Sequence, residues 1–556
     1  MAARHLLQVL MLLAYSLPLS QCAPGSGRVE LPSLLDATLD ELQSGLNAGH
    51  FTSVDLIRAY TARIDEVNSR LHAVNEINPD AVSIAAHHDA LRYSGNLIGP
   101  LHGIPVVIKD NIGTADKMNN TAGSYALLGA EIPEDSTVAR KLREAGAIIL
   151  GKANLAQWSG ARGDITQGWS AYGGQCIGAY YPDMDPDGSS SGSGTAASVG
   201  LAWAALGTDT TGSIADPSSK HNLVGIKPTM GLTSRYLVVP ISEHQDTVGP
   251  MARTVKDAAY LLSAIAGSDE HDNYTSASPF GDQVPDYVAA CKGKGLHGRR
   301  IGVPRHMVQL GPNKPSDYML GIFDSAVDVL RAQGAEVIDD IILPGAADLL
   351  NSKYSPFVTG PDIMANIPRY FSQLKTNPNN ITTMVQLREF IQNDAREGYP
   401  EKNTSSWDRG ISRGYDNTSP VWWGNYTAQA ELAGPQGIAG AVKKYSLDAI
   451  VLPTEYLSKL AAPLGNPVIS VPVGRTPDDT PLEKNEFGTL NIKGPNQPFG
   501  LGFTGARFSE EVLFEIAYAF EQATMVRRTI IPYIQPKTEL KDIVGKRQDT
   551  NGNLEL

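Results

Sequence analysis

The sequence predicts an α/β protein, in which helices cover a β-sheet. The first observation is an alternation along the chain: an apolar, β-branched run at 104–109, an amphipathic helix at 136–145 and a second apolar run at 147–150. The second observation is a pair of apolar runs near the C-terminus, at 448–453 and 467–473, which have the composition of buried strands. Strand, helix and strand in this order are typical of a sheet with helices packed on it.

Helices are predicted on either side of this alternation. Residues 36–77 have the pattern helix, turn, helix; Thr52 or Ser53 can cap the second helix, and Gly49 can end the first. A further apolar helix is expected over 195–206.

The last third of the chain contains a less regular region and a final helix. Residues 355–430 are rich in Asn, Pro, Gly and Trp, and we interpret them as a divergent surface region. Ser509 can cap the final amphipathic helix. Its expected core face consists of Leu513, Ile516, Ala517 and Phe520.

The first 23 residues have the pattern of a secretory signal peptide. Arg4 and His5 precede an apolar run at 6–17, and small and polar residues follow at 20–23. This run is shorter than the roughly 20 residues that a bilayer span needs. We therefore expect a secreted, extracellular protein whose mature part, 24–556, forms one domain without a stable membrane span.

Two residue types bear on export. Cys22 lies at the expected cleavage site, and Cys176 and Cys291 either form one disulfide or remain apart. An exported chain would also be a candidate glycoprotein, because it contains six N-x-[ST] sequons. They begin at Asn119, Asn273, Asn380, Asn403, Asn417 and Asn425.

Charge and histidine placement argue against two classes of function. The formal net charge of −13 argues against a nucleic-acid partner, since phosphate binding needs a basic face. The 11 histidines are scattered and no H-E-x-x-H motif occurs, so a zinc hydrolase is not favoured. We expect no metal and no cofactor.

The segment 187–229 carries the chemistry, because its Gly, Ser and Thr residues allow backbone amides to approach a ligand. Residues 188–192 match the G-x-S-x-G elbow of α/β-hydrolases, and 192–197 imitate a dinucleotide fingerprint. Both motifs require a preceding strand, whereas 180–187 has the composition of a turn. A purely structural Gly/Ser-rich loop is the remaining simple interpretation.

With its neighbours, this segment resembles the amidase signature family, the Ser-cisSer-Lys amidases. The motifs that carry the resemblance are LHGIPVVIKDNI, DGSSSGS, GTDTTGSI, GIKPT and GNPVISVPVG. It covers nearly the whole mature chain except 355–430. The resemblance implies one amidase domain with a central mixed β-sheet flanked by α-helices on both sides.

The resemblance also implies roles for individual residues. Ser213 corresponds to the acyl-enzyme nucleophile, Ser189 to a bridging serine that follows a cis peptide bond, and Lys109 to the base. The oxyanion hole corresponds to the backbone amides of Thr210, Thr211, Gly212 and Ser213. By weaker analogy, Ser159 and its neighbour Trp158 line the substrate channel.

These residue types suit the chemistry. A serine hydroxyl needs an adjacent base to become a nucleophile. A lysine has an ordinary pKa near 10.4, and burial among small neutral residues lowers it. A neutral Lys109 could then take a proton from Ser213 through Ser189 and return it to the leaving amine.

The chain departs from the family pattern around the nucleophile. Family members carry Arg after Ser-Ile, whereas this chain has Ala215 followed by Asp216. The ion pair to Asp209 is then missing, or Lys220 supplies it. Asp209 can otherwise tie the loop to backbone amides.

Three functions remain open at this stage. The first is hydrolysis of a small-molecule carboxylic amide to carboxylate and amine or ammonia. The second is a secreted pseudoenzyme that only binds amides, suggested by Ala215 and by Thr211, which stands where the family has Gly. The third is an amide-transfer (amidotransferase) subunit, against which the signal peptide argues. Asp187 also replaces a family Gly, before the bridging serine. The sequence does not identify the amide or the oligomeric state.

Overall fold

A mixed β-sheet forms the centre of the computed structural model, which describes residues 30–310 and 314–545. The signal peptide predicted over 1–23 lies outside these residues. Within them, all elements belong to the unit that begins at Pro32, and one sheet contains eleven strands. In spatial order they are β1 (Val74–Ile77), β3 (Ala147–Ala153), β2 (Ile104–Lys109), β6 (Ala204–Asp209), β8 (Thr247–Ala252), β7 (Val224–Lys227), β12 (Val468–Arg475), β15 (Pro498–Thr504), β11 (Ala449–Pro453), β9 (Arg300–Val303) and β10 (Glu336–Asp339).

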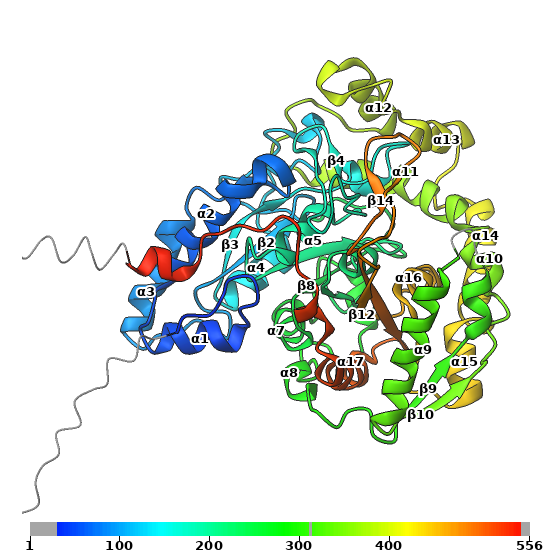
Figure 1. Cartoon of the computed structure of the whole chain (residues 1–556). Helices are drawn as coiled ribbons and strands as arrows, with labels where there is room; N and C mark the ends of the chain where they lie inside the picture. The colour runs from blue at the N-terminus through cyan, green and yellow to red at the C-terminus, as the bar shows by residue number, and fades with distance from the viewer. Residues whose placement is uncertain (1–29, 311–313, 546–556) are drawn as a thin grey trace, which may run out of the picture. The chain divides into compact units, whose positions relative to one another are not determined.

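Helices flank this sheet (Figure 1), which confirms the predicted α/β class. Figure 1 shows α7, α8 and α17 side by side, and these three helices contact one another. The helices are α1 (Leu39–Asn47), α2 (Ser53–Leu71), α3 (Ala81–Tyr93), α4 (Thr137–Glu144), α5 (Ser191–Ser198), α6 (Ala215–Lys220), α7 (Val255–Ile265), α8 (Tyr287–Ala290), α9 (Asp317–Ala332), α10 (Ala346–Leu350), α11 (Ser355–Gln373), α12 (Met384–Asn393), α13 (Ser405–Arg413), α14 (Pro420–Ala433), α15 (Ile438–Tyr445), α16 (Thr454–Ala461) and α17 (Glu510–Thr524).

The register of β2 and β6 positions the site. β2 runs parallel to β3 on one side and to β6 on the other, with Ile108 opposite Leu206. Both strands therefore end at the same edge of the sheet, β2 at Lys109 and β6 at Asp209. Side chains that follow parallel strands meet at this edge, which is where open α/β sheets bind ligands.

Several predicted elements are confirmed. Thr52 caps α2, and its hydroxyl accepts a hydrogen bond from the Asp55 amide. The helix predicted at 136–145 is α4, and the structure adds that Ser136 caps it. The predicted core face of α17 is completely buried. Among the described residues, no helix combines the length and apolar character that a membrane crossing requires.

Three local predictions are wrong. The helix expected over 195–206 ends at Ser198, and β6 begins at Ala204. A strand buried on both faces is apolar throughout, so periodicity alone could not distinguish it from a buried helix. The segment 36–77 includes the strand β1 after its two helices. Ser509 precedes α17, but its hydroxyl donates to the Ala506 carbonyl at 2.7 Å instead of capping the helix.

The cysteines and the divergent region also differ from the simplest expectation. Cys176 and Cys291 are free thiols, so the disulfide is not formed. Residues 355–430 contain α11–α14, and this region has its own buried side chains, including Trp407 and Trp422. The region is thus a helical layer with an apolar interior and not only a surface segment.

Candidate active site

Lys109 is the last residue of β2, and its side chain is completely buried. Its Nζ donates to Ser189 Oγ at 2.7 Å, to Thr208 Oγ1 at 2.8 Å and to the Thr208 carbonyl at 3.2 Å. Burial lowers the pKa of Lys109 to about 7, against the opposing effect of the negative charges of Asp209 and Asp246. The lysine is therefore substantially neutral near neutral pH and can act as a base.

Asp110 follows Lys109 but does not pair with it. Its carboxylate instead accepts hydrogen bonds from the Thr121 and Gly123 amides at 3.3 and 3.1 Å. Successive residues of an extended chain point to opposite faces, so the carboxylate of Asp110 faces away from the Lys109 ammonium.

Ser189 is buried against Lys109, and the Gly188–Ser189 peptide bond is cis, as the resemblance implied. A backbone hydrogen bond connects the two serine segments, because the Ser190 amide donates to the Ser213 carbonyl at 3.2 Å. Among the described residues, no hydrogen bond joins the hydroxyls of Ser189 and Ser213. Catalytic hydrogen bonds are often long without substrate and tighten in the Michaelis complex.

Asp209 organises the loop that carries Ser213. This buried carboxylate accepts hydrogen bonds from the Gly212 amide at 2.8 Å and the Ile214 amide at 2.7 Å. Gly212 has a φ of +99°, and a Cβ there would lie 2.2 Å from Asp216 Oδ2, so only glycine fits. Asp209 therefore ties the loop to backbone amides, the structural role that its sequence context suggested.

This arrangement narrows the predicted oxyanion hole. The Gly212 amide is already bound to Asp209, so it is not available as predicted. Thr210 donates its hydroxyl to Asp246 at 2.6 Å, and Thr211 is exposed. In the described chain, the backbone amides of Thr210, Thr211 and Ser213 have no hydrogen-bond acceptor and remain available for a developing oxyanion.

Asn111 and Thr208 are functional candidates that the sequence reasoning missed. Asn111 Nδ2 donates to Thr208 Oγ1 at 3.0 Å and lies 3.4 Å from Ser159 Oγ. It thereby holds the hydroxyl that accepts from Lys109. The signal was available, since both residues lie inside the quoted motifs.

Ser159 is half-buried and is linked to the lysine through Asn111 and then Thr208, whereas Trp158 is buried. Trp158 packs edge-on against Trp407, with ring centroids 5.7 Å apart. It is thus part of the contact with the helical layer α11–α14 and is not a free wall of a channel. The buried pair of Arg162 and Glu397, 3.3 Å apart, makes a second link between the same two regions.

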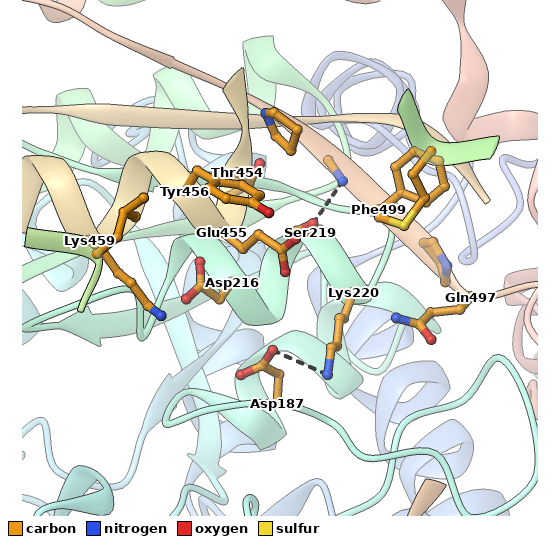
Figure 2. Close-up of a pocket in the computed structure, with 15 residues that line it drawn as sticks. Asp187, Asp216, Ser219, Lys220, Thr454, Glu455, Tyr456, Lys459, Gln497 and Phe499 are labelled. Atoms are coloured by element: carbon orange, nitrogen blue, oxygen red, sulfur yellow. Dashed lines mark hydrogen bonds and ion pairs between the residues drawn. The ribbon is translucent and has the colours of Figure 1, made fainter. Parts of the chain in front are cut away.

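Lys220 does not replace the missing arginine beside Asp209. Its Nζ instead forms an ion pair with Asp187 Oδ2 at 3.4 Å (Figure 2). The two residues line a cavity of about 260 Å³, together with Asp216 and residues of α16 and β15. Asp209 needs no cation, because backbone amides satisfy both of its oxygens.

The chain is similar to known amidases in sequence and in fold. The amidase family model matches residues 55–461. A putative amidase of Arthroderma benhamiae is 48% identical, with 93% of this chain and 90% of the relative covered. A probable amidase of Arabidopsis thaliana is 36% identical, with coverage of 89% and 91%. The solved structure of native peptide amidase from Stenotrophomonas maltophilia superimposes with a TM-score of 0.80 at 36% identity, over 89% of this chain and 98% of that one.

Proposed function

The chain belongs to the amidase family and is an enzyme that hydrolyses amides, and from this premise we propose that it acts through a Ser213 acyl-enzyme with Ser189 as relay and Lys109 as base. The observation that carries the proposal is the 2.7 Å contact between the buried Lys109 Nζ and Ser189 Oγ. A neutral lysine in that position accepts the Ser189 proton while Ser189 takes the proton of Ser213.

The proposed reaction has two halves. Ser213 Oγ attacks the amide carbonyl carbon, and the backbone amides of Thr210, Thr211 and Ser213 stabilise the oxyanion. When the tetrahedral intermediate collapses, the C–N bond breaks and the amine leaves with the proton returned through Ser189. Water then attacks the acyl-enzyme with Lys109 again as base, which releases the carboxylate and regenerates Ser213.

A serine-directed fluorophosphonate tests the nucleophile. We expect the probe to label the purified protein at Ser213, with the labelled peptide identified by mass spectrometry. Ser213→Ala should abolish labelling, and Lys109→Met and Ser189→Ala should slow it strongly. A folded wild-type protein that is not labelled would instead support the pseudoenzyme that only binds amides.

We also propose that the enzyme is secreted. The support is the N-terminal pattern of a basic pair, a short apolar run and small residues. N-terminal sequencing of protein from the medium should begin near residues 21–26. Protein that retains Met1, found only inside the cell, would contradict export.

A further inference from the structure

The cavity beside the nucleophile loop contains an unbalanced negative charge. Its walls carry three carboxylates and two ammonium groups, which are Asp187, Asp216, Glu455, Lys220 and Lys459. Lys220 pairs with Asp187 (Figure 2). Lys459 lies one helical turn from Glu455 on α16 and offsets its charge electrostatically. Asp216 is then the carboxylate left without a cation.

The surroundings of Asp216 show what it lacks. In the described part of the chain, its Oδ1 is buried and has no hydrogen-bond partner. Its charged neighbours are the carboxylates of Asp187, Asp209 and Glu455, and the Ser458 hydroxyl is a hydrogen-bonding neighbour of its side chain. Together with burial, they raise the pKa of Asp216 well above its usual range. Asp216 is partly buried, and a carboxylate oxygen that is buried without a partner is costly, so a bound cation would remove that cost.

Two residues that line the cavity are close in sequence to the proposed catalytic serines. Asp187 is two residues before Ser189, and Asp216 is three residues after Ser213 and contacts Gly212. Asp187 stands where the family pattern has Gly, and Asp216 follows Ala215, where that pattern has Arg. One departure from the family pattern, Asp187, and the residue that follows the other, Asp216, therefore lie on the wall of one cavity.

Resting on the proposed function, we propose that this cavity binds an alkylammonium or guanidinium group of the amide substrate, with Asp216 as the carboxylate that receives it. A monovalent cation would balance the single excess negative charge. The volume of about 260 Å³ far exceeds the roughly 10–15 Å³ that one water requires, so an organic group fits. Among the described residues, no group of three or more Asp, Glu, His and Cys side chains is arranged to hold a metal ion, which favours an organic cation.

Paired substrates test the preference. We expect kcat/KM for N-acetyl-lysinamide to exceed that for N-acetyl-norleucinamide at least tenfold, or N-acetylcadaverine to exceed N-pentylacetamide by that factor. The lysinamide pair places the cation on the acyl side of the scissile bond, and the cadaverine pair places it on the amine side. Asp216→Asn should reduce the preference to nearly one, mainly through KM. Lys459→Met is the control, because it removes a positive charge from the same cavity. This variant should preserve or increase the preference for the cationic amide.

A binding measurement separates this inference from the proposed mechanism. Butylammonium should bind the wild-type protein at least tenfold more tightly than butanol does by calorimetry, and Asp216→Asn should lose that difference. Ser213 labelling with no preference for either cationic amide, and no butylammonium binding, would overturn the cation site and leave the mechanism intact. Butylammonium binding without Ser213 labelling would support the site and refute the nucleophile.

Discussion

The rate at which Ser213 reacts should follow the ionisation of Lys109. Only neutral Lys109 accepts a proton, and its pKa is about 7, so the reactive fraction is about one tenth at pH 6 and about nine tenths at pH 8. We therefore expect the rate constant for fluorophosphonate labelling, or kcat/KM for an amide, to rise about tenfold between these values and then to level off.

Two variants identify the group responsible. Lys152 is also buried, and burial lowers its pKa to about 8, but it binds Asn120 and the Ile112 carbonyl instead of a serine. Lys152→Met should leave the midpoint of the profile near pH 7. Burial also raises the pKa of Asp246 to about 6, so its ionisation could contribute to the lower end of the pH profile. In Asp246→Asn, the rate should still rise with pH above about 7, because Lys109 is unchanged. A rate that is flat between pH 6 and 8 would refute the assignment of Lys109 as base.

The same ionisation should appear in folding stability. The ordinary lysine pKa of 10.5 applies to the unfolded chain, so between pH 7 and pH 10.5 the unfolded state holds one more proton at this site than the folded state. The free energy of unfolding of the wild type should therefore rise with pH, relative to Lys109→Met, by about 1.4 kcal/mol per pH unit in that window. Urea unfolding at pH 7, 8 and 9 measures the difference, and a constant difference would contradict it.

Three further changes test other parts of the structure. Asp209→Asn should lower kcat/KM by about 10²-fold, because the side-chain amide nitrogen cannot accept a hydrogen bond from the backbone amides of the loop that positions the oxyanion donors. A variant with the kcat/KM of the wild type would show that the loop keeps its conformation without the Asp209 carboxylate. Glu397→Gln removes the charge that pairs with a completely buried arginine, so the free energy of unfolding measured with urea should fall by about 3–5 kcal/mol, and a change below about 1 kcal/mol would be inconsistent with that burial. If the chain is exported, mass spectrometry after glycosidase treatment should find glycans at Asn273 and Asn380, whose side chains are exposed. It should find none at Asn417, which is buried and donates to carboxylates; a glycan at Asn417 would contradict its placement.

The features that the sequence predicted correctly lie where short motifs coincide with the ends of strands and helices. The strand 104–109 and its terminal lysine, the cap Thr52, the helix predicted at 136–145, and the small residues around Ser189 all have local signals. Asp209 was also interpretable, since a carboxylate just before a turn can bind the amides of that turn. These features depend on residues close together in the chain, so local patterns contain the information.

The structure was needed where the decisive neighbours are distant in sequence. The run 195–206 is apolar in either conformation, and only pairing with β2 and β8 makes its second half a strand. The Gly212 amide binds Asp209, and Lys220 pairs with Asp187. Both contacts depend on the directions of side chains, which residue spacing in the sequence does not specify.

By itself, the sequence determined the α/β class, the family and the identity of the candidate lysine and serines, because each rests on local pattern and residue type. The tertiary structure alone decided that Lys109 is buried against Ser189 and that Asp187 and Asp216 share one cavity. The physical reason is that burial and electrostatic pairing are properties of side chains brought together from separate segments, and these properties set the pKa values and the charge left unbalanced beside the nucleophile.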